Sequence, residues 1–179
     1  MGPPPSRMMD HAPTTQPQFH PPMPAATTPR FMDQALAEAA AAAQAGEVPV
    51  GAVIVDGTSG RVLARAHNRV ETDRDPTAHA ELLAIRAAAA ALGENARGKA
   101  LTGCDLYVTL EPCPMCAQAI AFARLRRVYW GADDPKGGGV EHGPRIFEQP
   151  SCHHAPELYP GIGERQAATL LKDFFKARR

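Results

Sequence analysis

The sequence predicts an α/β fold in which helices cover a sheet that is largely parallel after an initial hairpin. Segments typical of strands alternate with segments typical of helices from about residue 30 onward. The first two strand segments are separated only by a tight turn, which indicates an antiparallel pair. The length of 179 residues, 44% of them hydrophobic, suits one domain of roughly 150 residues.

Residues 1–30 are predicted to be a disordered Pro-rich arm that precedes a folded domain at residues 31–179. The arm contains nine of the 18 prolines and almost no periodic apolar pattern. A segment of this composition buries too little apolar surface to offset its loss of conformational entropy. A Pro-rich docking peptide is the alternative, but no repeated P-x-x-P register with flanking basic residues accompanies it.

The first helix and a hairpin follow the arm. Thr28 and Pro29 supply a capping residue and a first helical proline, and the alanine-rich segment after them ends at Gly46. Residues 52–55 and 62–64 are apolar segments on either side of a turn that contains two glycines. This arrangement predicts two antiparallel strands.

The remaining elements alternate between helix and strand. Asp75 and Pro76 predict the start of a helix that Gly93 closes. Residues 106–110 are β-branched and aromatic enough for a buried strand that ends at Glu111. We further expect a helix at 114–123, a strand at 127–130 and a C-terminal helix at 164–176.

Charge and hydropathy limit the possible partners only in part. The 19 Lys and Arg residues balance the 19 Asp and Glu residues, so bulk electrostatics do not favour nucleic acid or an anionic membrane. The apolar runs are far shorter than the roughly 18 residues that span a bilayer, and no secretory signal is recognisable. We therefore expect a cytoplasmic protein that does not associate with membranes. The total charge does not exclude local clusters of one sign.

Two short stretches, residues 79–81 and 112–116, contain the candidate chemistry. Each lies at a predicted helix start, so the two starts can converge at one edge of the sheet. If Cys113 is the N-cap and Pro114 the first helical residue, Cys116 lies one turn further along the same helix. The positive end of the helix dipole then favours the thiolate forms that bind metal.

His79, Cys113 and Cys116 would supply one imidazole and two thiolates, a donor set that suits Zn²⁺. Three protein ligands leave a fourth position for water, as expected of a catalytic zinc. Zinc lowers the pKa of such a water from about 15.7 towards about 7, which provides hydroxide at neutral pH. Glu81, two residues from His79, is placed to take the proton of that water.

Other interpretations of the cysteines remain open at this point. Four cysteines in a reducing compartment favour metal binding or catalysis over disulfides. A redox-active Cys-x-x-Cys is one alternative, although it has no need of a separate His-x-Glu. A structural zinc with Cys152, His153 or His154 as fourth ligand is another, as is a second metal site there. We expect residues 152–154 to form a surface loop.

The ordered pair of motifs is similar to the signature of zinc-dependent cytidine and deoxycytidylate deaminases. Within that superfamily the chain resembles the bacterial tRNA-specific adenosine deaminases, for which this signature is described. The resemblance covers nearly everything after residue 30. The stretches that match this family are residues 47–52, 67–69, 75–81, 106–113, 127–132 and 171–175.

The resemblance implies hydrolytic deamination of adenosine to inosine at the wobble (first anticodon) position of tRNA, with release of ammonia. It implies a three-layer α/β/α sandwich with a five-stranded mixed sheet (cytidine deaminase-like), a homodimer, and the anticodon stem-loop as partner. One Zn²⁺ per subunit would be held by His79, Cys113 and Cys116, with Glu81 as the proton shuttle.

The resemblance also implies residues that contact the substrate. Asn68 matches the pocket asparagine of the family, and Pro49, Val50 and Arg69 lie in the matching stretches. The loop at residues 136–143 departs from the family's Lys-Thr-Gly-Ala-like sequence, which leaves its RNA contacts open.

Arginines and lysines near the pocket are the candidates for RNA phosphate contacts, since surrounding phosphates require basic side chains. The candidates are Arg124, Arg126 and Arg127, which form the densest basic cluster, and Arg69, Lys136, Arg178 and Arg179. An ordinary solvated face is the alternative for each of them. Trp130 and Cys104 are expected in the core.

Two rival functions share these motifs. A deaminase of a free nucleobase or nucleoside, such as guanine or cytosine/cytidine, would have the same zinc core with a different pocket. A non-catalytic RNA-binding subunit could retain zinc for structure alone, but Glu81 would then have no purpose beside an open coordination position.

Overall fold

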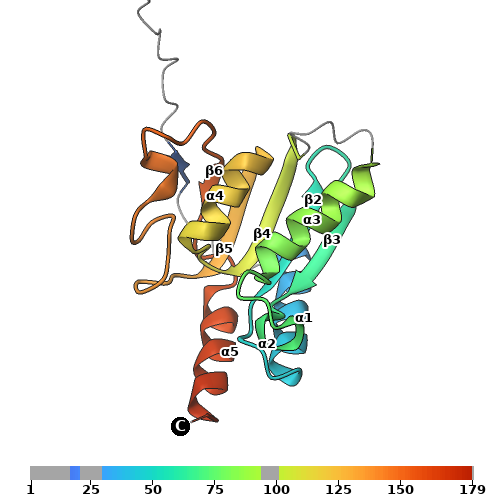
Figure 1. Cartoon of the computed structure of the whole chain (residues 1–179), viewed down its shortest axis with the longest axis vertical. Helices are drawn as coiled ribbons and strands as arrows, with labels where there is room; N and C mark the ends of the chain where they lie inside the picture. Colours follow the sequence, from blue (N-terminus) through green and yellow to red (C-terminus); the bar gives the residue numbers. More distant parts are fainter. Residues whose placement is uncertain (1–16, 21–29, 94–100, 179) are drawn as a thin grey trace, which may run out of the picture.

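A six-stranded mixed sheet in the order β1-β6-β5-β4-β2-β3 forms the middle of the molecule (Figure 1). The computed structural model describes residues 17–20, 30–93 and 101–178. The strands are β1 (Gln18–Phe19), β2 (Gly51–Asp56), β3 (Val62–His67), β4 (Cys104–Leu110), β5 (Arg127–Ala132) and β6 (Glu157–Tyr159). The helices are α1 (Arg30–Gln44), α2 (Val70–Asp73), α3 (Ala80–Leu92), α4 (Pro114–Ala123) and α5 (Glu164–Lys176), with a 3-10 turn at Ile146–Glu148.

The pairing of the strands confirms the predicted mixed α/β sheet. β2 pairs antiparallel with both β3 and β4, whereas the pairs β4–β5, β5–β6 and β6–β1 are parallel. Parallel neighbours need crossover connections, and α4 supplies the one between β4 and β5. The carboxyl end of β4 therefore leads directly into the start of α4.

Alternation along the strands divides the core between the two faces of the sheet. Ile54 and Leu106 pack with the small residues of α3 and α4, such as Ala84 and Ala117. The intervening residues face the opposite way, where Val53, Tyr107 and Tyr129 pack with Met32 of α1. Figure 1 shows α3 and α4 side by side over one face of the sheet. Helices on both faces give the predicted three layers.

The sheet has one more strand than the five that the resemblance implied. Strand β1 comes from the arm at residues 1–30, where no structure was predicted, and pairs with the edge strand β6. The amide of His20 donates to the Leu158 carbonyl at 2.9 Å, and the His20 ring stacks on Tyr159 at 4.4 Å. Residues 17–20 take a defined structure because β1 pairs with β6, which is far away in the sequence. Composition alone gives no sign of such a contact.

The start of the second long helix differs from the prediction. Asp75 accepts hydrogen bonds from the amide and hydroxyl of Thr77, which makes a turn instead of a helix. Helix α3 begins at Ala80 with His79 as its N-cap. The predicted cap at Thr28 and Pro29 lies outside the described residues. Helices α4 and α5 have the predicted bounds.

Four short elements among the described residues were not predicted, namely β1, α2, β6 and the 3-10 turn at Ile146–Glu148. No helix among the described residues is long and apolar enough to cross a membrane.

Candidate active site

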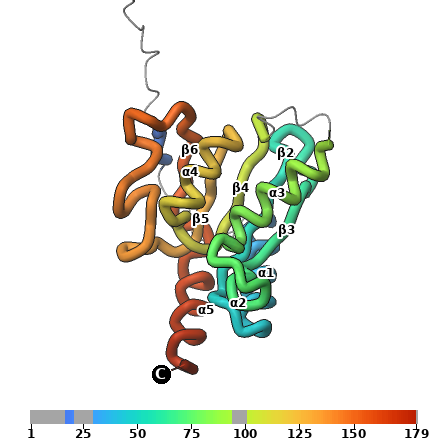
Figure 2. The backbone as a smooth tube through the Cα atoms, in the orientation of Figure 1, coloured from blue at the N-terminus to red at the C-terminus, as the bar shows by residue number. Residues whose placement is uncertain are grey.

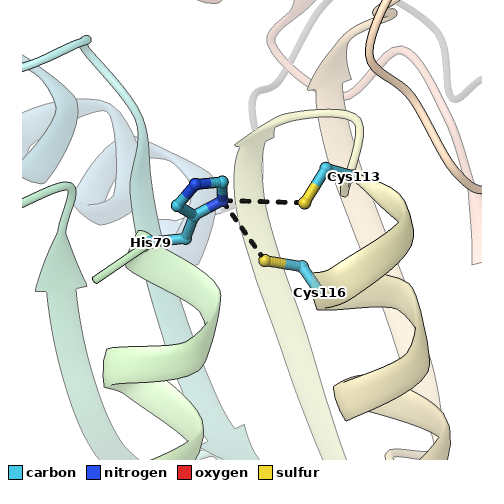
Figure 3. A group of neighbouring side chains, drawn as sticks. All are labelled: His79, Cys113 and Cys116. Atoms are coloured by element: carbon cyan, nitrogen blue, oxygen red, sulfur yellow. Dashed lines mark hydrogen bonds between the residues drawn. The ribbon is translucent and has the colours of Figure 1, made fainter. Parts of the chain in front are cut away.

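The starts of α3 and α4 bring His79, Cys113 and Cys116 together. His79 and Cys113 are the N-caps of the two helices, both in extended backbone conformation, and Pro114 fixes the first turn of α4. His79 Nδ1 lies 3.6 Å from the Sγ atoms of both Cys113 and Cys116. Figure 3 shows the imidazole of one helix pointing at the two sulfurs of the other.

This arrangement fits a tetrahedral zinc ion. Zn–S and Zn–N bonds of about 2.3 and 2.1 Å at a tetrahedral angle place the ligand atoms about 3.6 Å apart. Both measured sulfur–nitrogen separations equal that value. The three ligand atoms lie within 4.8 Å of one another, and they are the one His/Cys/Asp/Glu group with metal-site geometry among the described residues. The three side chains therefore fit a three-ligand zinc site.

The two cysteine thiols affect each other's pKa. A hydrogen bond from Cys116 lowers the pKa of Cys113 to about 4, with His79 as a further donor. The same hydrogen bond raises the pKa of Cys116, since its thiol is the donor and it is also buried. The pKa of His79 is raised, chiefly by its hydrogen bond to Cys113. A site of this kind attracts a cation.

Glu81 lies in the first turn of α3, next to this site. Its side chain is buried, and burial raises its pKa to about 7, with the nearby Cys113 charge acting in the same direction. Its carboxyl interacts with the Cys116 thiol. An ionisable group buried beside a metal site without being one of the three ligands has the placement of a proton carrier.

A cavity of about 430 Å³ opens at His79. Asn68, which is 8% exposed, lines it. The remaining lining residues are Gly46, Glu47, Val48, Val70, Glu71, Phe174 and Arg178. The cavity therefore lies between the end of α1, the region of α2, the zinc site and the last turn of α5.

The other residues predicted to contact substrate lie outside the cavity lining. Pro49 and Val50 are buried, and the Val50 carbonyl accepts the amide of Asn68 at 3.0 Å. This hydrogen bond fixes the backbone of Asn68. Arg69 makes a bidentate pair with Asp73 on α2. Its guanidinium is thus already paired with a carboxylate four residues along the chain.

The predicted basic cluster lies at the far end of α4 from the zinc ligands. Arg124 caps the carboxyl end of that helix. Arg126 is paired with Asp105, and Arg127 with Glu157, at 2.7 and 2.8 Å. Two of the three arginines therefore have a carboxylate partner within the fold.

Arg178 and Lys136 are exposed cations, the first at the cavity and the second on a loop that contacts the Cys113 turn. Arg178 lines the cavity, donates to the Gly46 carbonyl at 3.0 Å and lies over the Phe174 ring. Lys136 lies on the loop after β5, which contacts the Cys113 turn through a hydrogen bond from Gly139 to Pro112. Arg179 lies outside the described residues.

The remaining sequence predictions concern residues outside the site. Trp130 and Cys104 are buried in the core. Cys152 donates to the His154 carbonyl, and His154 Nε2 contacts the Leu125 carbonyl at 2.6 Å. Those contacts anchor the predicted loop, but Cys152 is buried in the core and not at the surface.

Three residues at or near the site were not predicted as functional. Glu47 and Phe174 line the cavity, and Glu111 binds the loop after β5. Glu47 and Glu111 are acidic residues buried in the interior, but burial is not visible in the sequence.

The comparisons with known proteins agree with this geometry. Residues 26–132 match the model of the cytidine and deoxycytidylate deaminase zinc-binding region. A tRNA-specific adenosine deaminase of Agrobacterium fabrum is 55% identical over 149 residues, which cover 83% of this chain and 94% of that protein.

Two solved structures are also similar. One comes from a study of A-to-I editing by tRNA:A34 deaminases at the wobble position; it has 56% identity and a TM-score of 0.73, and the match covers 79% of this chain and 98% of that one. A guanine deaminase from Bacillus subtilis has 43% identity and a TM-score of 0.52, with 57% of this chain and 62% of that chain covered.

Proposed function

The chain belongs to the family of zinc-binding cytidine and deoxycytidylate deaminases, and on that premise we propose that it converts the wobble adenosine of a tRNA to inosine. The observation that carries the proposal is the three-ligand zinc site with buried Glu81 beside a cavity that Asn68 lines. The relatives named for tRNA adenosine deamination match nearly their full lengths. It is thus a zinc-dependent hydrolase.

Zinc at this site would supply the nucleophile. When bound by His79, Cys113 and Cys116, zinc lowers the pKa of a water towards about 7 and makes it a nucleophile near neutral pH. The chain's own residues handle the protons and the base.

We assign the proton transfers to Glu81. Hydrolysis forms a bond from the water oxygen to C6 of adenine and breaks the bond from C6 to the exocyclic nitrogen, which leaves as ammonia. Glu81 takes one proton from the water and gives it to the ring nitrogen N1; it then takes the second proton from the new C6 hydroxyl and delivers it to the leaving amine. Its position in the first turn of α3, beside the ligands, supports this assignment.

We assign recognition of the base to Asn68. Its side chain presents both donor and acceptor groups to the cavity, which suits the edge of a flipped-out base. The carbonyl of Val50 holds the backbone of Asn68 in position, and Pro49 and Val50 remain proposed substrate contacts. Glu47 accepts the amide and hydroxyl of Thr72 at 2.7 and 2.8 Å, and this fixes the α2 side of the cavity.

For the phosphates around the base we propose Lys136 and Arg178. Both are exposed, and Arg178 lies at the cavity. Arg124, Arg126, Arg127 and Arg69 remain predicted contacts, but the carboxylate partners of three of them favour structural roles. We further propose the anticodon stem-loop as the recognised element, a homodimer as the assembly, and the cytoplasm, where tRNA is decoded, as the location.

The second candidate is a deaminase of a free base or nucleoside. The likeness to a guanine deaminase is the observation that favours it, although that match covers less of both chains. The two functions differ in the need for an RNA surface beside the cavity.

The test offers purified, zinc-loaded protein two kinds of substrate. One is an anticodon stem-loop with adenosine at the wobble position, and the other is free adenosine, guanine or cytidine at equal concentration. We expect inosine in the stem-loop and no ammonia from the free compounds. Turnover of a free compound without turnover of the RNA would favour the second candidate.

A further inference from the structure

Glu111 binds an entire loop through its carboxylate, although it belongs to neither the zinc site nor the cavity. It follows β4 and precedes the Pro112–Cys113 turn, and its side chain is 0% exposed. Its Oε1 accepts the backbone amides of Val140, Glu141 and His142 at 3.2, 2.8 and 2.9 Å. Its Oε2 accepts the amide of Asp134 at 3.0 Å and contacts His142 Nδ1 at 2.7 Å.

The bonds from Asp134 continue this network to Lys136. Asp134 Oδ1 accepts the amides of Lys136 and Gly137 at 3.1 and 2.9 Å. Glu111 therefore fixes Asp134, and Asp134 fixes the backbone of the exposed Lys136. We call residues 134–142 the Glu111 loop. Figure 2 shows the backbone of this region, in orange, beside α4.

Two glycines let the loop approach so closely. A Cβ on Gly138 would lie 2.5 Å from the carboxyl of Glu111, and one on Gly139 would lie 2.5 Å from the Pro114 nitrogen. The amide of Gly139 also donates to the Pro112 carbonyl at 2.8 Å. The loop is thus held against both Glu111 and the turn that contains Cys113, which explains the glycine-rich sequence at this point.

We propose that Glu111 is a positioning residue for RNA recognition, which holds the Glu111 loop in the conformation that presents Lys136 to a phosphate. The proposal rests on the proposed function, in which Lys136 contacts the RNA. A carboxylate is acceptor-only, so it can satisfy several convergent N–H groups at once. A loop ordered before binding avoids the entropic cost of ordering on the RNA.

The test is a comparison of Glu111→Gln with the wild-type enzyme on the stem-loop. The amide has the size of the carboxyl, but its NH₂ group would face the N–H donors of the loop. We expect KM to rise about fivefold while kcat stays within about twofold. Zinc content should be unchanged. Glu148→Gln, an exposed carboxyl on the following 3-10 turn, serves as the matched control with unchanged KM.

Two further variants connect the effect to the loop. Gly138→Ala crowds the same contact while leaving Glu111 intact, and it should reproduce the rise in KM. Lys136→Ala should also raise KM, and combining it with Glu111→Gln should add little, because both changes remove the same phosphate contact.

The outcomes separate this proposal from the proposed function. If the wild-type enzyme does not turn over the stem-loop, the proposed function fails. If the wild type is active but Glu111→Gln leaves KM unchanged, lowers zinc content, or adds its full effect to that of Lys136→Ala, the role given to Glu111 is wrong. Amide exchange at residues 140–142, faster in Glu111→Gln, reports loosening of the loop independently of RNA.

Discussion

His79 and Cys113 show how local sequence signals place a site. Each is a helix N-cap, so the orientation of its side chain follows from the start of the helix. Pro114 specifies one of these starts, because proline is favoured in the first turn, where its missing N–H costs nothing. The convergence of these two side chains with Cys116 was therefore predictable at the residue level.

Glu111 and Glu47 show where prediction at this scale ends. The loop partners of the Glu111 carboxylate are 23 to 31 residues away in sequence. Those of Glu47 are 24 and 25 residues away. Neither contact has a signal in a short window, since it forms only when the sheet and its connections are assembled. Carboxylates like these resemble surface residues until burial is known.

Glu81→Ala tests the proton carrier. We expect the variant to fold and to keep one zinc per subunit, because Glu81 is not one of the three ligands. Inosine formation should fall by at least about a hundredfold, the typical contribution of a positioned acid–base group. The measurement is single-turnover inosine formation together with metal analysis. Activity near the wild-type level in the zinc-loaded variant would show that another group moves the protons.

At the scale of elements, predictions succeeded where the pattern was long. Helices α4 and α5 have the predicted bounds, and β2, β4 and β5 appear where apolar runs indicated strands. Strands β1 and β6 have two and three residues, and their existence depends on pairing with neighbours. The predicted helix start at Asp75 was wrong, because a capping residue followed by proline also suits a turn.

The edge strand β6 gives a prediction about pH. Hydrogen bonding from Arg127 lowers the pKa of Glu157 from its usual value, with a smaller contribution from Tyr159. A group whose pKa is lower in the folded state stabilises the fold above its unfolded pKa, here about 4.3. That stabilisation shrinks as pH falls below this value and is absent below the folded-state pKa.

Urea unfolding of the wild type and Glu157→Gln at several pH values checks this. The wild type should be the more stable at pH 7, and the difference should close as pH falls below about 4.3. The difference should be small, because both side chains are about one-third exposed. A difference that stays constant from pH 7 to pH 3 would rule out the charged pair as its cause.

Strand β1 gives a prediction about the arm. Deleting residues 1–30 removes β1 and the stacking of His20 on Tyr159. We expect a loss of about 1 kcal/mol, or about 3 °C in Tm, with zinc content and turnover nearly unchanged. Deleting only residues 1–16 should leave Tm at the wild-type value. A large loss of zinc or turnover in the longer deletion would make the arm part of the working enzyme.

At the scale of the whole molecule, the net charge of zero was a weak guide to the partner. Fifteen of the 19 basic residues are arginine, but Arg126 and Arg127 are paired with carboxylates at the end of α4 distant from the zinc ligands. Recognition of one short RNA loop needs only a few cations beside a pocket. In the proposed function, Lys136 and Arg178 fulfil that need without changing the overall charge balance.

The two halves of the domain meet at the site. The hairpin β2–β3 with α3 supplies His79, Glu81 and Asn68, whereas β4 with α4 supplies the cysteines. Helix α5, the last element of the chain, closes the cavity with Phe174. The function therefore depends on the complete domain.

The position of inosine in the product is the sharpest test of wobble-adenosine deamination. The substrate is an anticodon stem-loop with one adenosine at the wobble position and others elsewhere in the loop, and the product is sequenced after treatment with zinc-loaded enzyme. Wobble-adenosine deamination predicts inosine at the wobble position alone, with release of one ammonia per RNA. Inosine at other loop adenosines, or ammonia without inosine in the RNA, would contradict it.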